Sequence, residues 1–276
     1  MGVATRTIRH AAVAGQFYPD DPAKLHKLVE SYMADAHIAA APEQVDALVA
    51  PHAGYIYSGP TAGYAYARVR GKRPVRVILL GCSHRHAFDT SSVFTEGIFE
   101  TPIGGFPVDE DFAVTVAEAL DSVGPEPHLR EHGLEVHLPF IAEAIGFVPI
   151  VPVLFGSPVS SWHAEAGRRL AALAGPGDLL VTSTDLSHYL TNEQANEIDL
   201  RSVRSVLAGD WRSFAGGIDE GTCAMCGAAA VVAAMNYALE RGAETWQLLD
   251  YRTSANASGD YSRVVGYAAL SMERAA

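Results

Sequence analysis

The stretch Val75-Arg-Val-Ile-Leu-Leu-Gly-Cys-Ser-His84 decides the fold class of this 276-residue chain. Its first six residues are apolar except for Arg76, which predicts a short strand that is buried on both faces. A polar cluster, 81–84, follows the strand directly. Buried strands of this kind form parallel sheets, and ligands bind beyond the carboxyl ends of such strands. The stretch therefore predicts an α/β fold with reactive side chains at one edge of its sheet.

Apolar and amphipathic segments alternate on both sides of this stretch. Helices are predicted from about residue 22, where Asp21 can cap the helix, and over 61–69, 109–120, 134–145, 160–174, 192–207 and 226–241. Pro139 indicates a kink or a late start in the fourth of them. Further strands are predicted over 45–50, 91–95, 148–155, 179–182, 247–251 and 264–272.

This alternation predicts a three-layer α/β architecture, in which helices cover both faces of a mostly parallel or mixed central sheet. The chain contains no Pro/Gly/Ser-rich linker, no low-complexity tract and no repeat of fixed period. We therefore expect a single domain over residues 1–276.

The charge balance argues against nucleic acid as a partner. The formal net charge is −12, and no run of Lys or Arg is longer than a pair, so a phosphate backbone would be repelled. Charged residues make up 19% of the chain, below the roughly 25% of an average soluble protein. This deficit indicates that much of the surface is covered, either by thick layers or by partner subunits, so a homo-oligomer is an expectation.

The N-terminus and the cysteines indicate a cytoplasmic protein. Residues 1–12 contain no hydrophobic core of signal-peptide length, and three cysteines cannot all pair within one chain. The uncharged stretch 222–239 is near the lower length limit of a membrane span. It consists mostly of Ala and Gly rather than Leu, Ile and Phe, so we expect a helix buried within the protein and no membrane association.

Reactive residues follow three of the predicted strands. The polar clusters are Ala50-Pro-His52-Ala-Gly-Tyr55, Gly81-Cys-Ser-His84-Arg-His86 and Asp185-Leu-Ser-His188. If the strands are parallel, these clusters share one edge of the sheet, and His52, His84, Asp185 and His188 converge. A single histidine after a strand is more often a structural residue, but three such endings favour a common site.

Two cysteines near the last predicted helix allow several interpretations. Cys226 precedes a helix, whose dipole lowers the pKa of a thiol and favours its metal-binding form. Histidine and thiolate together are typical ligands of iron, copper or zinc. Cys223 lies three residues earlier, and the pair could instead pack in the core or form a redox dithiol. The redox hypothesis is disfavoured because thioredoxin-type pairs follow a strand near the N-terminus of a βαβ unit.

A second dense cluster lies in Glu131-His-Gly-Leu-Glu-Val-His-Leu-Pro-Phe140. Zinc proteases use His-Glu-x-x-His or His-x-x-Glu-His, whereas the spacing here is His-x-x-Glu-x-His, which excludes that class. Two interpretations remain open. His132, Glu135 and His137 either contact substrate and support the first ligands, or they belong to a polar helix start that carries surface histidines.

These motifs resemble the Memo-like family, which includes the B component of bacterial AmmeMemoRadiSam systems. The family is similar in structure to the B-type subunits of class III extradiol ring-cleaving dioxygenases, which implies an extradiol-dioxygenase B-subunit-like fold. The resemblance covers nearly the whole chain. The motifs that carry it are Ala-Gly-Gln-Phe-Tyr-Pro near residue 14, Ala50-Pro-His-Ala-Gly-Tyr-Ile-Tyr-Ser-Gly59, Leu80-Gly-Cys-Ser-His84, 131–140, Ser183-Thr-Asp-Leu-Ser-His188 and Met225-Cys-Gly227.

The resemblance implies a metal site formed by His52, His84 and Cys226. Cys82 stands where the family usually has proline, and the family offers no counterpart for Cys223. Iron(II) is the first expectation for the metal, with copper or zinc as alternatives. The third ligand is a cysteine where the dioxygenases use a carboxylate, so ring cleavage does not follow directly from the likeness.

Two functions follow from this interpretation, and the sequence separates them poorly. In the first, a metal-dependent, dioxygenase-like oxidoreductase acts on a small aromatic or otherwise acidic substrate. His188 would be the acid–base group, Asp185 would orient it or balance its charge, and Tyr55 and Tyr57 would line the mouth of the site. In the second, the protein is a metal-binding or peptide-binding scaffold without catalysis. Gene-set association alone supports a third role in assembly with radical-SAM partners.

Overall fold

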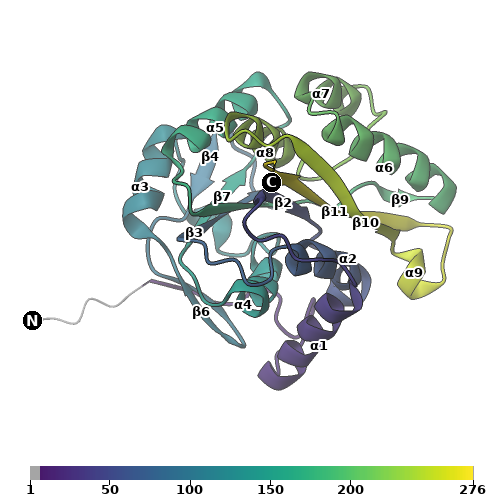
Figure 1. Ribbon diagram of the computed structural model, residues 1–276, viewed down its shortest axis with the longest axis horizontal. Coiled ribbons are helices and arrows are strands. Elements are labelled where there is room, and N and C mark those ends of the chain that lie inside the picture. Colours follow the sequence, from purple (N-terminus) through teal and green to yellow (C-terminus); the bar gives the residue numbers. More distant parts are fainter. Residues whose placement is uncertain (1–6, 276) are drawn as a thin grey trace, which may run out of the picture.

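Four parallel strands form the centre of the main sheet, in the spatial order β2, β8, β3, β7. Figure 1 labels three of them, β2, β3 and β7. The computed structural model describes residues 7–275. Half of the N-terminal segment 1–12 discussed above, residues 1–6, therefore lies outside the described residues. The central strands are buried along almost their whole length, as their mostly apolar sequences predict. Their bounds are β2 (Val45–Ala50), β8 (Asp178–Ser183), β3 (Arg76–Cys82) and β7 (Ile150–Phe155).

Antiparallel strands extend the sheet at both sides, so the sheet is mixed. β11 pairs with β2 and with β10 on one side, β4 pairs with β7 on the other, and the short β9 pairs with β11. A separate three-stranded sheet has the order β1, β5, β6. The bounds are β11 (Val264–Glu273), β10 (Thr245–Thr253), β4 (Ser91–Val93), β9 (His188–Leu190), β1 (Ile8–Arg9), β5 (Ile98–Thr101) and β6 (Gly104–Pro107).

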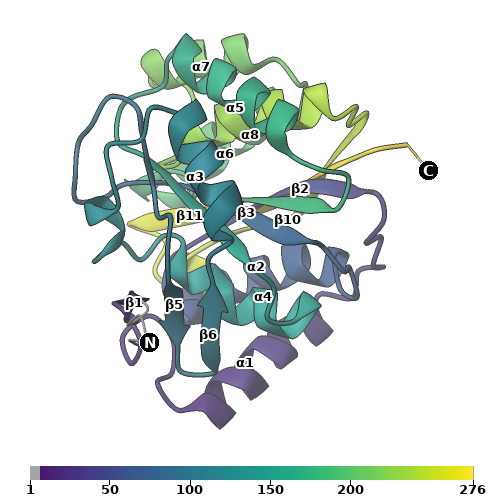
Figure 2. The ribbon, with the colours of Figure 1, turned by 90° about the vertical axis from the view of Figure 1, so that its left-hand side faces the viewer.

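Helices cover both faces of the main sheet and complete a three-layer α/β arrangement (Figure 2). One layer contains α8 (Ala228–Glu240), α5 (Ser161–Leu173), α3 (Glu110–Ala119), α6 (Asn192–Leu207) and α7 (Trp211–Asp219). The opposite layer contains α2 (Tyr55–Arg68), α1 (Pro22–Asp35) and α4 (Leu138–Ile145). The short helices are two 3₁₀ turns, Glu126–His128 and Glu135–His137, and α9 (Ala255–Ser258).

Helix α8, which carries no charge before its last residue, Glu240, is buried between α5 and the central strands. Its close contact with α5 depends on Gly167, because a Cβ at that position would lie 2.1 Å from the carbonyl oxygen of Ala233. This burial explains why residues 222–239 carry no charge. Within residues 7–275, no helix is both long and apolar enough to cross a membrane.

The observed elements differ from the predicted ones in a few places. Helix α2 begins at Tyr55 rather than at residue 61, because Pro60 removes one backbone donor near the helix start without ending the helix. The segment 134–145 starts late as a regular helix: Glu135–His137 forms a 3₁₀ turn, and Pro139 occupies an early position of α4. The small sheet, β9 and α7 were not predicted.

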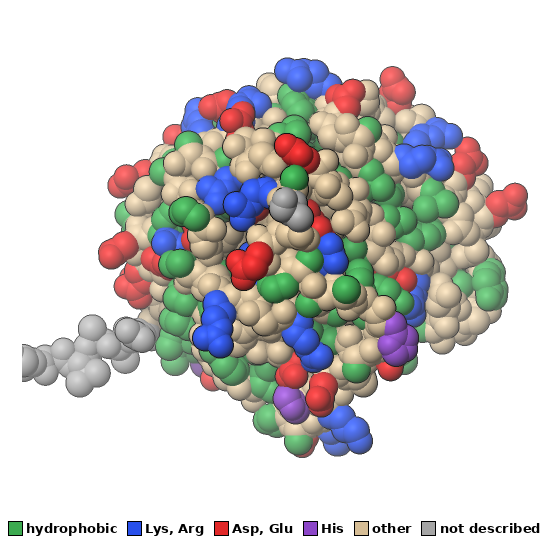
Figure 3. All heavy atoms as spheres, viewed as in Figure 1, with side chains coloured by type: hydrophobic (Ala, Val, Ile, Leu, Met, Phe, Trp, Pro, Cys, Tyr) green, Lys and Arg blue, Asp and Glu red, His purple; other side chains and the backbone are tan. Residues whose placement is uncertain are grey.

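Acidic and basic side chains are scattered among hydrophobic ones on the face drawn in Figure 3. Elsewhere in the described residues, exposed ion pairs include those of Arg168 and Arg169 with Glu165 on α5. Exposed pairs of this kind contribute little to stability, so the buried sheet and helices hold the fold together.

Candidate metal centre

The predicted cluster of reactive residues lies at the carboxyl ends of β2, β8 and β3, which are neighbours in the sheet. His52 follows β2, Asp185 follows β8 and His84 follows β3. Cys226 precedes α8, which packs against the same strands. One ligand atom from each of His52, His84 and Cys226 lies within 4.8 Å of the others. The topology therefore brings together residues from three distant parts of the chain.

The imidazole of His52 is held so that Nε2 is free. Its Nδ1 lies 2.7 Å from the hydroxyl oxygen of Ser183, and that hydroxyl donates to the carbonyl oxygen of Gly133 at 2.5 Å. Since the hydroxyl proton is used there, the Ser183 oxygen accepts from the Nδ1–H of His52. This tautomer leaves the lone pair of Nε2 available for a metal.

Glu131 holds His84 in the corresponding way. One carboxylate oxygen accepts from the Nδ1 of His84 and from the backbone N–H of Gly133, each at 2.8 Å. The other oxygen accepts from the backbone N–H of His84 at 2.8 Å. Burial alone would raise the pKa of Glu131, but these hydrogen bonds and the positive charge of His84 lower it to about 2. Histidine ligands commonly have such a carboxylate behind them.

Backbone groups stabilise the sulfur of Cys226. The backbone N–H of Asp185 donates to Sγ at 3.2 Å, and Sγ lies 3.4 Å from Nε2 of His52. Gly227 allows this approach, because a Cβ there would lie 2.5 Å from the carbonyl oxygen of Ser183. The following helix adds the positive end of its dipole. Together these contacts favour the thiolate form of Cys226.

The shifted pKa values favour a thiolate at Cys226 and protonated imidazoles at His52 and His84 when no metal is bound. The pKa of Cys226 is lowered well below its ordinary value by the Cys82 thiol and by both imidazoles, although burial opposes this shift. Burial by itself would lower the pKa values of the two histidines. The charges of Cys226 and Asp185 outweigh it at His52 and raise the pKa to about 9, and the hydrogen bonds to Cys226 and Glu131 raise the pKa of His84 to about 10. A divalent cation would replace these protons on the same atoms.

The distances fit a first-row metal. Bonds of 2.0–2.1 Å to nitrogen and about 2.3 Å to sulfur, at tetrahedral angles, place the two ligand atoms about 3.5 Å apart. The distance between Cys226 Sγ and His52 Nε2 is 3.4 Å. Two neutral imidazoles and one thiolate are donors that iron, copper and zinc accept.

Asp185 contacts His52 directly. Its Oδ1 accepts from the backbone N–H of His52 at 2.8 Å, and its Oδ2 lies 3.9 Å from Nε2 of the same residue. Burial raises the pKa of this carboxyl. Among the described hydrogen bonds none joins Asp185 to His188, but the charge of His188 lowers the pKa of Asp185, so the predicted role of balancing that charge stays a prediction.

His132 lies beside the ligands. Its ring centroid is 4.6 Å from that of His84 and 5.4 Å from that of His52. Its Nδ1 lies 3.3 Å from Oε1 of Glu131. Burial, reinforced by the charge of His52, lowers the pKa of His132 to about 4, so the ring is neutral near pH 7.

Glu135 and His137 have structural contacts instead of the predicted contacts with substrate. Glu135 is fully buried, where it pairs with Arg9 and accepts hydrogen bonds from the backbone of Ala12 at 2.7 Å. His137 is buried too, and its Nδ1 lies 2.9 Å from the hydroxyl of Tyr66. The second interpretation, a polar helix start that carries histidines on the surface, is also wrong for His137 because its side chain is buried. Both residues face the core because the 3₁₀ turn that carries them packs under the N-terminal segment.

The two tyrosines that were predicted to line the mouth differ in exposure. Tyr55 is buried, its hydroxyl donates to the carbonyl oxygen of Val136 at 2.6 Å, and its ring lies in the wall of a surface groove. Tyr57 is 41% exposed and lines the same groove. His188 is exposed as well, and its Nδ1 lies 2.9 Å from the carbonyl oxygen of Leu186, which leaves Nε2 free.

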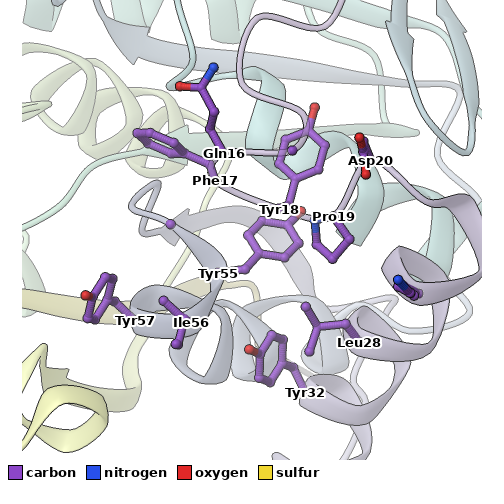
Figure 4. Close-up of a pocket in the computed structure, with 13 residues that line it drawn as sticks. Gln16, Phe17, Tyr18, Pro19, Asp20, Leu28, Tyr32, Tyr55, Ile56 and Tyr57 are labelled. Carbon is purple, nitrogen blue, oxygen red and sulfur yellow. The ribbon is translucent and has the colours of Figure 1, made fainter.

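The groove has a volume of about 730 Å³ and lies between the segment 15–20, α1 and the start of α2. Figure 4 shows aromatic rings along its walls, including Tyr18 and Tyr55, whose centroids are 5.4 Å apart. Phe17 connects the groove to the metal-ligand cluster, because its ring packs against His132 with 4.9 Å between centroids. An apolar surface therefore adjoins the cluster.

Three residues that contact the histidines of the cluster were not predicted from the sequence to have such a role. Glu131 and Ser183 fix the two imidazoles, and Cys82 lies 3.5 Å from Nε2 of His84. Glu131 stands beside a histidine in a dense polar motif, which was a usable signal. A serine at the end of a buried strand carries no such signal.

The fold and this cluster define a three-layer α/β protein with two histidines and a cysteine at the edge of its sheet. The profile of the family described as "Memo-like protein" matches residues 9–271. The chain belongs to the Memo-like family.

Curated relatives support this assignment over almost their full length. A MEMO1 family protein of Methanopyrus kandleri is 32% identical over 280 residues, covering 96% of this chain and 99% of the relative. One from Desulfurococcus amylolyticus is 33% identical over 277 residues, covering 95% and 98%. A solved structure of an uncharacterized protein from Escherichia coli K12 has a TM-score of 0.52 at 15% identity, covering 82% of this chain and 99% of that one. That likeness supports the fold alone.

Proposed function

We propose that the protein is a metal-dependent, dioxygenase-like oxidoreductase with non-haem iron or copper held by His52, His84 and Cys226. The observation that carries the proposal is the pair of free Nε2 atoms that share one small space with the sulfur of Cys226. A metal bound there would supply redox chemistry and Lewis acidity. Three protein ligands from one side are typical of sites that keep positions open for substrate.

The surrounding residues would prepare the substrate. His188 is exposed, and its described hydrogen bond uses Nδ1 and leaves Nε2 available. We propose that Nε2 takes the proton of an acidic substrate such as a phenol. The neutral ring of His132 would contact the substrate beside the ligands. The apolar groove behind Phe17 suits the body of a small aromatic molecule.

The first experiment is metal analysis of protein that was purified without chelator, followed by oxygen uptake with a panel of catechols. His188→Ala should keep the metal content of the wild type and lower turnover by about 10²–10⁴-fold, as expected for a positioned acid–base group. His26→Ala is the matched control, because His26 is an exposed histidine on α1 that pairs with Glu143. It should behave like the wild type in both measurements.

The outcomes separate the alternatives. Loss of metal from the His188→Ala protein would mean that His188 is a fourth ligand of a closed site. Full metal content without oxygen uptake on any substrate of the panel would favour the non-catalytic, metal-binding scaffold.

A further inference from the structure

The loop that carries His188 is held by β11. Residues 184–187 connect β8 to β9, which begins at His188. The backbone N–H of Leu186 donates to the carbonyl oxygen of Gly266 at 2.8 Å, and the N–H of Gly266 donates to the carbonyl oxygen of Ser187 at 3.0 Å. These two bonds leave the carbonyl group of Leu186 and the N–H of Ser187 for other partners. The two groups belong to the same peptide unit.

This peptide unit lies between His188 and Asp199. On one side, the carbonyl oxygen of Leu186 lies 2.9 Å from Nδ1 of His188. Because a carbonyl oxygen only accepts, Nδ1 of the neutral ring carries the proton and Nε2 keeps its lone pair. On the other side, the N–H of Ser187 donates to Oδ1 of Asp199 at 2.9 Å. Two hydrogen bonds therefore connect the carboxylate to the imidazole through one peptide unit.

Burial and close packing fix the position of Asp199. It lies on α6, which packs against β9, β10 and β11, and it is fully buried. Its Oδ2 accepts from the hydroxyl of Tyr251 at 2.9 Å, so each oxygen has a neutral donor, the arrangement expected of a carboxylate. A Cβ at Gly266 would lie 1.8 Å from Oδ2, so β11 leaves room for the carboxylate because it has a glycine at this point.

We propose that Asp199 is the positioning residue of His188 and acts on it through the Leu186–Ser187 peptide unit. The inference rests on the proposed role of His188 as the acid–base group, and it gives Asp199 the orienting role that the sequence predicts for Asp185. In a catalytic triad, a carboxylate that binds the Nδ1–H of a histidine holds the tautomer whose Nε2 can take a proton. Here the peptide unit transmits the same effect.

The physical basis is polarisation of the peptide unit. A negative charge at its N–H strengthens its carbonyl oxygen as an acceptor, because hydrogen bonds in a chain polarise one another. When Nε2 takes the proton of a substrate, the positive charge of the ring is stabilised along this chain, and no electron is transferred. The interaction is mutual: burial raises the pKa of Asp199, whereas the hydrogen bonds from Ser187 and Tyr251 and the charge of His188 act in the opposite direction.

The test is an NMR measurement of the His188 tautomer in the metal-free full chain, from the chemical shifts of the two ring nitrogens. The pH is chosen so that the ring is neutral, and the signal is the one that His188→Ala lacks. Asp199→Asn keeps an oxygen that can accept from Ser187 but removes the charge. The wild type should show the Nδ1–H form, and Asp199→Asn should show a measurable fraction of the Nε2–H form.

Asp250→Asn is the matched control. Asp250 is a partly buried carboxylate on β10 that accepts from Thr61 at 2.7 Å and from Arg252 at 2.9 Å. Neither bond involves the loop 184–187, so this variant should keep the wild-type tautomer. Tyr251→Phe is a second test variant, because it releases Oδ2 of Asp199 while the charge remains, and it should cause a smaller change of the same kind.

Oxygen uptake with the catechol panel provides a second readout. Asp199→Asn should lower kcat by about 10-fold, a part of the about 10²–10⁴-fold that a positioned acid–base group supplies. The KM and the metal content should stay unchanged, because Asp199 contacts neither the substrate nor the proposed ligands.

The outcomes separate this inference from the proposed function. An unchanged tautomer in folded Asp199→Asn, checked by circular dichroism, would mean that Asp199 only supports the fold. If Asp199→Asn fails to fold, an unchanged tautomer in Tyr251→Phe overturns the inference in the same way. If the tautomer changes as expected but the wild type consumes no oxygen with any catechol, the link between Asp199 and His188 holds and the oxidoreductase proposal fails.

Discussion

Replacing Glu131 by Gln tests whether the carboxylate behind His84 tunes the metal site. Glu131 accepts three hydrogen bonds through its two oxygens, so an amide can keep at most two and must face one donor with its NH₂ group. Although burial opposes ionisation, its pKa of about 2 against 4.5 corresponds to about 3 kcal/mol in favour of the carboxylate. Loss of such a partner typically costs about 10- to 100-fold in metal affinity.

The assay is a zinc(II) titration of metal-free protein in competition with a chelator near neutral pH. A decrease in affinity of about 10- to 100-fold is expected, which equals about 1.4–2.7 kcal/mol. Glu135→Gln is the control, since Glu135 is an equally buried carboxylate that pairs with Arg9 and has no described bond to a ligand. Wild-type affinity in the Glu131→Gln protein, or an equal loss in the control, would refute the reasoning.

Three further predictions concern the cysteines, the acid stability and the N-terminal anchor. Cys226→Ser should lose most of its metal by elemental analysis while Cys223→Ser retains it, and equal losses would indicate a Cys-x-x-Cys pair instead. Burial, reinforced by the charge of Arg9, lowers the pKa of His128 to about 4 against 6.5. The unfolded chain therefore binds the proton first, so the contribution of this residue to stability is complete above pH 6.5 and falls as the pH drops towards 4. The fall in the denaturant midpoint across this range should be smaller in His128→Gln than in the wild type. Arg9→Met leaves the buried Glu135 without its partner and should lower the free energy of unfolding by about 3–5 kcal/mol, measured by urea unfolding.

The positions of the reactive residues could be predicted because parallel strands align their carboxyl ends. His52 and His84 each follow a mostly apolar run, and that pattern indicates two strand ends at the same edge. The order of the strands, with β8 between β2 and β3, depends on crossovers that hydrophobic periodicity does not specify.

The direction of each side chain was harder to predict than its position. Glu131 and Glu135 lie four residues apart in one polar motif, yet one holds a histidine of the centre and the other pairs with Arg9. The difference arises from the 3₁₀ turn at Glu135–His137 and from the N-terminal segment that packs on it. Partners that are over a hundred positions away in the chain leave no local pattern, so Arg9 could not be linked to Glu135 in advance.

The position of β8 between β2 and β3 also determines at which stage of folding the proposed metal site can form. His52 and Cys226 are 174 positions apart, and the sheet must assemble before their donor atoms meet. In a zinc finger, by contrast, the metal drives folding because the ligands lie close together in the sequence. Here the buried strands and α8 supply most of the apolar burial, so we expect the chain to fold without the metal. The metal would then bind to the protein after folding, and the fraction of protein that holds metal would depend on the concentration of the ion in the cell.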